Sequence, residues 1–529
     1  MIGIVDSIIM MLSQMSGQSI SDFCELETNS RHRKALVSRD GSLMTLVKVD
    51  GLNMMVGDEE FRLAVSKVTN ALNVLFAQKG HTIQFGFNYD PETVFNEIGV
   101  ALGRAKVTAS NLSLDMAGLL SERQSHLSRF CSSESIYIAV WTHTLVLSQD
   151  EMKRINNARG RKDKKNPPPS VPDAQSYTVE YEDIGDRHQS AVESLIAELG
   201  IAGVNVKTLN AHEMAFELRN AIDPGFTSHN WRPILQGDKI PLRLGQKMRS
   251  KADLSTIAYP PLSEQIIPRD AELLNGQMVV IGDRIYLPVY IDLMPQDVHR
   301  FSSLFSKLIN SGLPWKINFQ LGSEGMSAIS AKSMLAAYTS FASDTNKQID
   351  RAVKSLRERA FNGGTLASIR ICLTTWIAGS DSEEKRDKLK SRASTLVRSV
   401  ENWGQCQLSE VTGDPLAGMF SAVTGLTSKN IGNPSVAPVE EIAEMLPLFR
   451  PGTPWKEGAV MFRTPDGKVW PYQPGSSQQT TWINLIFAPP GRGKSVLLNM
   501  MNLALCLGPG NKELPLIHII DIGPSSSGL

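Results

Sequence analysis

A glycine-rich run occupies residues 488–495 of the chain and reads Ala488-Pro489-Pro490-Gly491-Arg492-Gly493-Lys494-Ser495. The apolar segment 482–487 comes directly before it, and an apolar, helix-like pattern begins with Val496 directly after it. A strand, a glycine-rich turn and a helix in this order are the setting of a phosphate-binding P-loop. Such loops commonly begin with Gly, and Ala488 is a mild departure because a small side chain still fits a tight turn.

The chemistry expected of this loop depends on its backbone and on two side chains. Backbone N–H groups of the turn and the positive end of the following helix favour bound phosphate groups. In a P-loop, Lys494 would reach the β- and γ-phosphates of a nucleotide, and the Ser495 hydroxyl would hold Mg²⁺. We therefore predict ATP and Mg²⁺ as cofactors, residues 488–496 as the binding loop, and Lys494 and Ser495 as its catalytic members. Arg492 either touches a phosphate or is a solvated loop arginine.

A second strand is predicted one helix after the loop. The helix should end at Leu507-Gly508-Pro509-Gly510, and residues 514–521 are apolar enough for a strand parallel to the first. Asp521 would then lie at the carboxyl edge of the sheet, either as a Mg²⁺-binding carboxylate or as a residue that orients the loop. No later strand that ends in Asp-Glu is present. We therefore expect the start of a RecA-like parallel-sheet ATPase domain within a longer protein, with the catalytic Glu outside this chain.

Composition bounds the kind of protein. The chain of 529 residues carries 54 basic and 54 acidic residues, and 42% of its residues are hydrophobic. These values fit a globular protein of several domains, and the absence of net charge disfavours a broad nucleic-acid-binding surface. The five cysteines are scattered and form no CxxC pair, so free thiols in a reducing compartment are expected. No apolar run is long enough to span a bilayer.

Hairpin signals mark two mixed α/β regions. The Asp40-Gly41 turn separates two strand patterns within residues 33–50, and Gly282-Asp283 separates two within residues 278–291. In both regions a helix and a further strand are predicted after the hairpin. The order of elements therefore recurs, although the sequence itself shows no repeat.

The predicted organisation has six parts, and the expected fold class is α/β. The N-terminal part either docks on a partner or an inner-membrane protein, or packs on its own domain as a helix. The parts are an apolar docking helix (1–27), a mixed α/β domain (28–150), a basic, proline-rich linker or loop (151–178), a helical or irregular segment (179–277), a second α/β and helical domain (278–445) and the beginning of the P-loop domain (446–529).

Three stretches together resemble one protein family. They are Arg39-Asp40-Gly41-Ser42-Leu43 with Val49-Asp50-Gly51, then residues 444–452, and then residues 460–523, which include the P-loop and Asp521-Ile522-Gly523. Their order is similar to that in the VirB-type energising ATPases of type IV secretion and conjugation systems, most of all in the Dot/Icm branch. The resemblance implies a cytoplasmic ATPase, peripherally associated with the bacterial inner membrane, that binds Mg-ATP through residues 491–495 and carries Asp521 at the end of its second motor strand.

The resemblance also implies partners and a role. The expected partners are inner-membrane components of the secretion system, a second hexameric secretion ATPase, and further copies of the chain in a hexamer or a hexamer of dimers. ATP binding and hydrolysis would drive or gate assembly and the export of protein effectors. Two alternatives remain. One is a non-catalytic docking platform for another secretion ATPase, with residues 1–445 as the scaffold. The other is a DNA translocase of the same fold, which the neutral charge disfavours.

Overall fold

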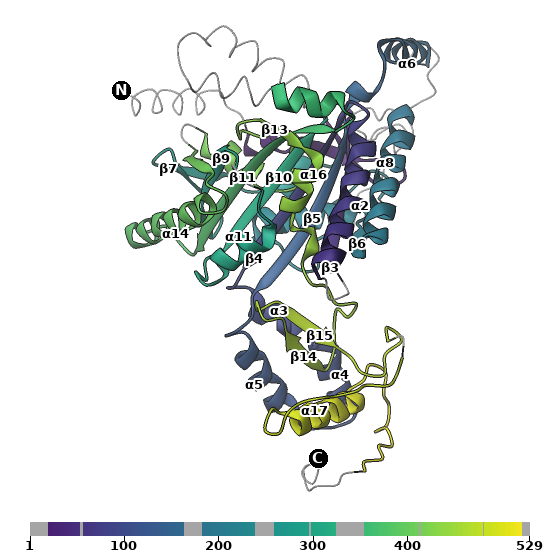
Figure 1. Cartoon of the computed structure of the whole chain (residues 1–529), viewed down its shortest axis with the longest axis vertical. Helices are drawn as coiled ribbons and strands as arrows, with labels where there is room; N and C mark the ends of the chain where they lie inside the picture. The colour runs from purple at the N-terminus through teal and green to yellow at the C-terminus, as the bar shows by residue number, and fades with distance from the viewer. Residues whose placement is uncertain are drawn as a thin grey trace, which may run out of the picture.

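The chain folds into two parts that are visible in Figure 1, a body built on one large sheet and a smaller lobe beneath it. The computed structural model describes residues 19–52, 57–162, 182–238, 259–295, 298–323, 354–411, 414–479 and 481–520. All neighbouring strands of the large sheet that pair in these ranges run antiparallel. The mixed α/β class expected from the sequence is therefore confirmed for the body.

The first half of the sheet comes from the N-terminal part of the chain. The hairpin expected around Asp40-Gly41 is present, and Gly41 has the positive φ, 84°, that its turn requires. The strands lie in the order β1-β2-β3-β5-β4, with β6 pairing along β3. Their bounds are β1 (Leu26–Asn29), β2 (Leu36–Ser38), β3 (Leu43–Leu52), β4 (His81–Asp90), β5 (Ser133–Thr142) and β6 (Val204–Thr208).

The second half of the sheet repeats this arrangement. The hairpin expected around Gly282-Asp283 is present, and the strands lie in the order β7-β8-β9-β11-β10, with β12 pairing along β9 and β13 along β11. The recurring order of elements seen in the sequence is thus confirmed as a repeated topology. The bounds are β7 (Ala271–Leu274), β8 (Met278–Ile281), β9 (Arg284–Leu293), β10 (Trp315–Gly322), β11 (Leu366–Ala378), β12 (Gln407–Glu410) and β13 (Ser435–Pro438).

The two halves join through their last strands. β4 and β10 pair along their length, with Gly86 opposite Asn318 near the centre of the seam. A fully buried tryptophan occupies the same place in each half, Trp141 of β5 beside β3 and Trp376 of β11 beside β9. Strands from the ranges 28–150 and 278–445 therefore build one continuous sheet.

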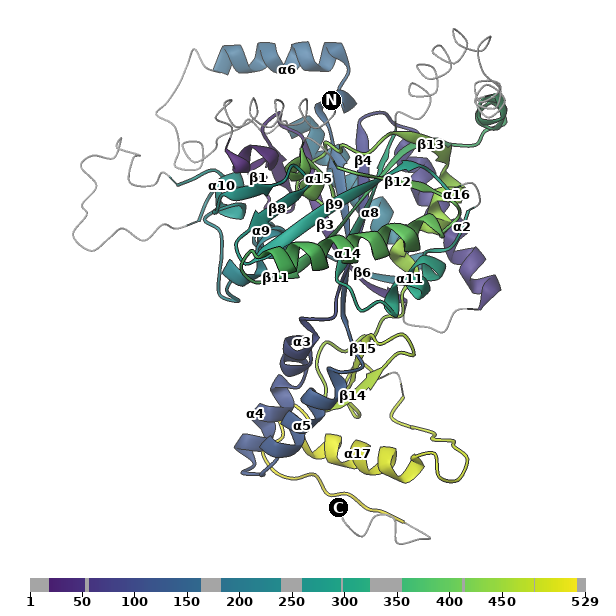
Figure 2. The ribbon, with the colours of Figure 1, turned by 90° about the vertical axis from the view of Figure 1, so that its left-hand side faces the viewer.

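Helices cover both faces of this sheet, and its central strands β4 and β10 are buried on both sides, with apolar side chains on one face and mostly polar ones on the other. Among the described residues, five helices share the larger core on one face (Figures 1 and 2), and three further helices cover the other face. The first set is α2 (Asp58–Phe76), α8 (Glu182–Ile201), α11 (Phe301–Ile309), α14 (Glu383–Glu401) and α16 (Val439–Met445). The second set is α9 (Ala211–Ile222), α10 (Leu262–Ile266) and α15 (Pro415–Ser421).

The predicted linker and docking helix are only partly described. Residues 149–162 form the helix α6 (Gln149–Lys162), so the expected linker does not begin at residue 151. Asp150 and Glu151 in its first turn favour this helix because they face its positive end. The rest of the basic segment and residues 1–18 lie outside the described residues.

Short 3₁₀ turns are η1 (Ile20–Phe23), η2 (Thr144–Val146), η4 (Pro224–Phe226) and η6 (Pro447–Phe449).

The lobe combines an insertion in the first half of the sheet with the C-terminal part of the chain. Three helices between β4 and β5 pack against a hairpin and one later helix (Figure 2). These elements are α3 (Val94–Ala101), α4 (Gly103–Asn111), α5 (Ala117–Leu127), β14 (Val460–Arg463), β15 (Val469–Tyr472) and α17 (Lys494–Cys506). Across the described ranges, no helix has both the length and the apolar character needed to cross a membrane.

Candidate nucleotide-binding site

The glycine-rich run forms an exposed turn at the beginning of α17, the helix at the lower end of the lobe in Figure 1. Gly491 and Gly493 have φ angles of 75° and 82°, in the left-handed region that other residues disfavour. The backbone N–H of Arg492 donates to the carbonyl of Pro489 at 3.3 Å and closes the turn. A Cβ at either glycine would meet no atom within 4 Å. Backbone conformation, and not crowding, therefore requires glycine at these positions.

The helix expected after the glycine-rich run is present and begins two residues before Val496, where its apolar pattern starts. α17 starts at Lys494, and the N–H of Leu497 donates to the carbonyl of Gly493 at 2.9 Å. The N–H groups of residues 494–496 come before this first bond and have no partner within the helix. The Lys494 side chain is exposed and Ser495 is half-buried. The residues expected to bind phosphate thus lie together at one accessible helix end.

The opposite end of α17 anchors the helix in the lobe. Ala504 and Leu507 are buried against α4 and β14. The side-chain amide of Gln473 donates to the carbonyl of Ala504 at 2.9 Å and accepts from the N–H of Ala459 at 3.0 Å. Because a buried polar group must be hydrogen-bonded, Gln473 fixes where the helix sits on the hairpin. The turn at the other end projects away from this core.

The space and the chemical groups of the glycine-rich turn are compatible with the phosphate chain of a nucleotide. Open space above both glycines allows an oxygen atom to approach the backbone, and the positive helix end favours an anion there. Lys494 would neutralise phosphate charge, and the Ser495 hydroxyl is a suitable oxygen ligand for Mg²⁺. Asp521 lies outside the described residues, so its place beside Lys494 and Ser495 stays a prediction.

The two strands expected on either side of α17 are not formed. Residues 481–489 and 511–520 pair with no other strand in the described part of the chain, which corrects the expectation of a parallel sheet here. Strands are stable only when their backbone groups and apolar faces find neighbours. Their apolar side chains are instead exposed, by 75% to 85% for Trp482, Ile483, Leu485 and Phe487, and by 86% and 99% for Leu516 and Ile520.

A buried ion network joins the lobe to the body. Arg450 follows η6, and its Nη2 lies 2.8 Å from Oε2 of Glu134 at the start of β5. Nζ of Lys468 lies 3.0 Å from Oε1 of the same carboxylate. Arg450 also pairs with Asp466 in the β14–β15 turn, and its guanidinium lies 3.9 Å from the ring centre of Phe305 in α11. Charges from both parts of the molecule therefore meet at one point.

Pairing favours the charged forms of Arg450 and Asp466 despite their burial. Burial acts to lower the pKa of Arg450, but the carboxylates of Glu134 and Asp466 outweigh it and raise that pKa above its usual value. Burial acts to raise the pKa of Asp466, but Arg450 and the hydroxyl of Thr464 hold that pKa below its usual value. The contacts within the joint thus favour the charged forms of Arg450 and Asp466.

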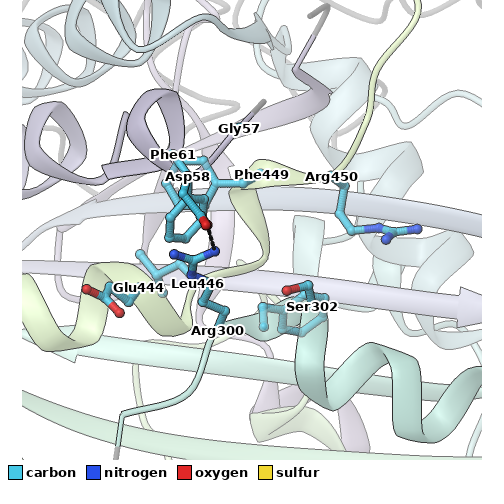
Figure 3. Close-up of a pocket in the computed structure, with 10 residues that line it drawn as sticks. Gly57, Asp58, Phe61, Arg300, Ser302, Glu444, Leu446, Phe449 and Arg450 are labelled. Atoms are coloured by element: carbon cyan, nitrogen blue, oxygen red, sulfur yellow. Dashed lines mark hydrogen bonds and ion pairs between the residues drawn. The ribbon is translucent and has the colours of Figure 1, made fainter. Parts of the chain in front are cut away.

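A pocket of about 400 Å³ opens beside this joint (Figure 3). At one end, Asp58 pairs with Arg300 at 2.8 Å, and the guanidinium of Arg300 lies 4.1 Å from the ring centre of Phe61. Arg450 lies at the other end, with its guanidinium turned away from Asp58 (Figure 3). Both arginines of the pocket are therefore already engaged in ion pairs.

Sequence reasoning missed the charged residues of the joint. Residues 444–452 and 460–467 stood out only through the family resemblance, without a role for Arg450 or Asp466. The available signal was a charged residue beside turn formers, as in Arg450-Pro451-Gly452. Glu134 lies 316 positions before Arg450, so spacing alone could not predict that they pair.

Comparison with known proteins leaves the family open. No protein-family model matches the chain, and no curated protein matches it significantly. The likeness to secretion ATPases therefore rests on residues 39–51, 444–452 and 460–523.

Proposed function

We propose that this chain belongs to an energising ATPase of a type IV secretion system and supplies the phosphate-binding loop of its motor. The observation that carries the proposal is the exposed turn with Gly491 and Gly493 in left-handed conformation, followed directly by a helix that begins at Lys494. This is the backbone arrangement that receives phosphate oxygens at a helix end. The resemblance of the three sequence stretches supports the secretion role.

In this proposal the two parts of the chain have different tasks. The body docks at the inner-membrane base of the channel, with inner-membrane components, a second hexameric ATPase and further copies of the chain as partners. The lobe binds Mg-ATP, with Lys494 on the β- and γ-phosphates and Ser495 on Mg²⁺. Asp521 would either bind Mg²⁺ or orient the loop. ATP turnover, completed by groups beyond this chain, would drive or gate the export of protein effectors.

The buried joint supports a coupling between these tasks. Arg450 and Lys468 both contact Glu134, so a displacement of the β14–β15 hairpin would strain an ion pair in the body. A buried ion pair tolerates little displacement because each charge loses part of its compensation where water cannot replace it. Nucleotide-dependent movement of the lobe would therefore be felt at the sheet.

Export by cells tests the motor role. Cells that carry Lys494→Ala in the full-length protein, at normal protein level, should lose export of effectors. Lys512→Ala, which removes an exposed lysine of the same lobe, is the matched control and should retain export. Export that survives Lys494→Ala would show that nucleotide binding at this loop is dispensable.

A second candidate function is a docking platform that does not hydrolyse nucleotide. The observation that favours it is the contrast between the complete sheet of the body and the unpaired segments around α17. A platform predicts normal export in Lys494→Ala cells, so the same assay separates the two candidates. The DNA translocase alternative instead predicts DNA binding that weakens steeply with salt.

A further inference from the structure

A second pocket, of about 340 Å³, lies where the lobe meets the body and is lined from both. Its walls come from β4, β9 and β10 of the sheet, from α9, and from the segment 422–424. Thr93 and Asn96 at the start of α3 contribute the wall on the lobe side. A molecule bound here would therefore contact the body and the lobe together, far from the glycine-rich turn of α17.

The pocket contains two buried cations and one buried carboxylate. Lys316 of β10 is 7% exposed, and the side chain of Arg284 of β9 is 12% exposed. Asp90, at the end of β4, lies 3.4 Å from Nη2 of Arg284 and is the nearest acid to both cations. The remaining acid of the pocket, Glu217, accepts from the hydroxyl of Tyr137 and pairs with Lys48 outside this group. When Lys316 is protonated, these three central groups carry one positive charge in excess.

Neighbouring groups partly compensate the charge of the Lys316 ammonium. The ammonium of Lys316 donates to the carbonyl of Ala221 near the end of α9, where the helix dipole favours a cation. It also lies 5.2 Å from the ring centre of Trp376, which Arg284 approaches to 5.4 Å. The ring centre of Tyr286 lies 5.9 Å from the same ammonium. One carbonyl and two aromatic rings compensate the charge of Lys316 less than a full negative charge would, and an uncompensated buried charge is costly.

We propose that this pocket binds a small oxyanion, a carboxylate or a phosphate group, between Arg284 and Lys316. The anion would supply the missing negative charge, and the guanidinium and ammonium groups would donate to it as charge-assisted hydrogen bonds. The side chains of Thr93 and Asn96 would donate from the lobe side. Occupancy would thus hold the start of α3 against the sheet. This inference does not depend on the proposed nucleotide site.

The binding should depend on pH with a defined sign. Burial, and then the charge of Arg284, lowers the pKa of Lys316 to about 7, while Asp90 opposes this. The other titratable groups that face the pocket are Glu217 and Tyr137 on one side and His229 on another. A bound anion raises the pKa of Lys316, so binding takes up protons near neutral pH. Affinity should therefore fall as the pH rises above about 7.

Calorimetric titration of the chain tests the site with two defined probes. Sodium sulfate represents tetrahedral oxyanions and does not titrate near neutral pH, whereas sodium acetate represents carboxylates, and sodium chloride sets the ionic strength. We expect at least one probe to bind with proton uptake, seen as a dependence of the heat on the buffer. Lys316→Met and Arg284→Gln should each weaken binding about tenfold or more, and Lys316→Arg should retain it.

Arg370→Gln is the matched control, because Arg370 lies in the second half of the sheet and donates to the carbonyls of Asn430 and Gly432. It should bind the probes as the wild type does. Circular dichroism checks the fold of each variant, and Arg284→Gln tests the site if Lys316→Met does not fold. The proposal is overturned if the folded wild type binds neither probe, or if a folded variant that lacks Lys316 or Arg284 binds as tightly as the wild type.

Discussion

Arg450 and Glu134 form a buried ion pair at the joint between the lobe and the body, with 2.8 Å between Nη2 and Oε2 and side chains only 7% and 3% exposed. The backbone is fixed at the same point. The N–H of Leu52 donates to the carbonyl of Arg450 at 2.8 Å, and the N–H of Gly452 donates to the carbonyl of Leu52 at 2.7 Å. A Cβ at Gly51 would lie 2.3 Å from the carbonyl oxygen of Arg450. Glycine is therefore required where the segments around Gly51 and Arg450 cross.

Arg450→Met should strongly destabilise the protein, because it leaves Glu134 buried without its main partner. Breaking a buried pair in this way costs about 3–5 kcal/mol. The free energy of unfolding from urea denaturation measures the loss. Arg359→Met removes an exposed arginine paired with Glu441 and should change the unfolding midpoint little, because exposed pairs are screened. Equal effects of the two substitutions would contradict a special role for the joint.

His188 should make stability fall in mild acid. Its ring nitrogens lie 2.7 Å from Oγ1 of Thr45 and 2.8 Å from Oγ1 of Thr142, in a buried site. Burial, and then neighbouring His81, lowers the pKa of His188 to about 3, whereas in the unfolded chain the pKa keeps its ordinary value of 6.5. The unfolded state therefore binds a proton first, and stability that is full above about pH 6.5 is lost progressively as the pH falls toward about 3.

His188→Asn keeps a polar side chain but removes this titration. Between about pH 7 and about pH 5, the wild type should lose about 2 kcal/mol more than the variant. Chemical denaturation of both proteins at the two pH values measures the difference. If both lose the same free energy, His188 does not titrate between the folded and unfolded states as its site implies.

The local features of the fold could be predicted from the sequence, because they depend on neighbouring residues. Asp40-Gly41 and Gly282-Asp283 indicate their hairpins, and the run before Lys494 indicates a glycine turn that opens a helix. The pairing of β4 with β10 could not be predicted, since it joins residues far apart through backbone bonds that leave no motif.

The insertion that builds the lobe escaped prediction for a similar reason. The helices α3, α4 and α5 lie between β4 and β5, and nothing in the spacing of their residues indicates that they pack on β14 and α17. The strands expected on either side of the P-loop are absent from the described residues for the opposite reason. Residues 482–487 have the apolar pattern of a strand, but a pattern gives no strand where the described chain offers no parallel neighbour.

Gly86 should tolerate no side chain, because it faces a crossing segment near the seam between β4 and β10. A Cβ there would lie 1.7 Å from Oγ1 of Thr424. Gly86→Ala should therefore lower the free energy of unfolding by about 1–3 kcal/mol through overpacking, and Thr424→Ala in the same chain should restore part of it. Gly103→Ala is the control, since a Cβ there meets no atom within 4 Å. A loss in Gly103→Ala as large as in Gly86→Ala would contradict the crowding argument.

Binding of Mg-ATP by the purified chain tests the central claim most directly. A fluorescent ATP analogue is titrated into the wild type, Lys494→Ala and Lys512→Ala. Because Lys494 would contribute charge-assisted bonds to the phosphates, its loss should weaken binding about tenfold or more, whereas Lys512→Ala should bind as the wild type does. Equal affinity in the wild type and Lys494→Ala, or no binding by either, would contradict a nucleotide site at this loop.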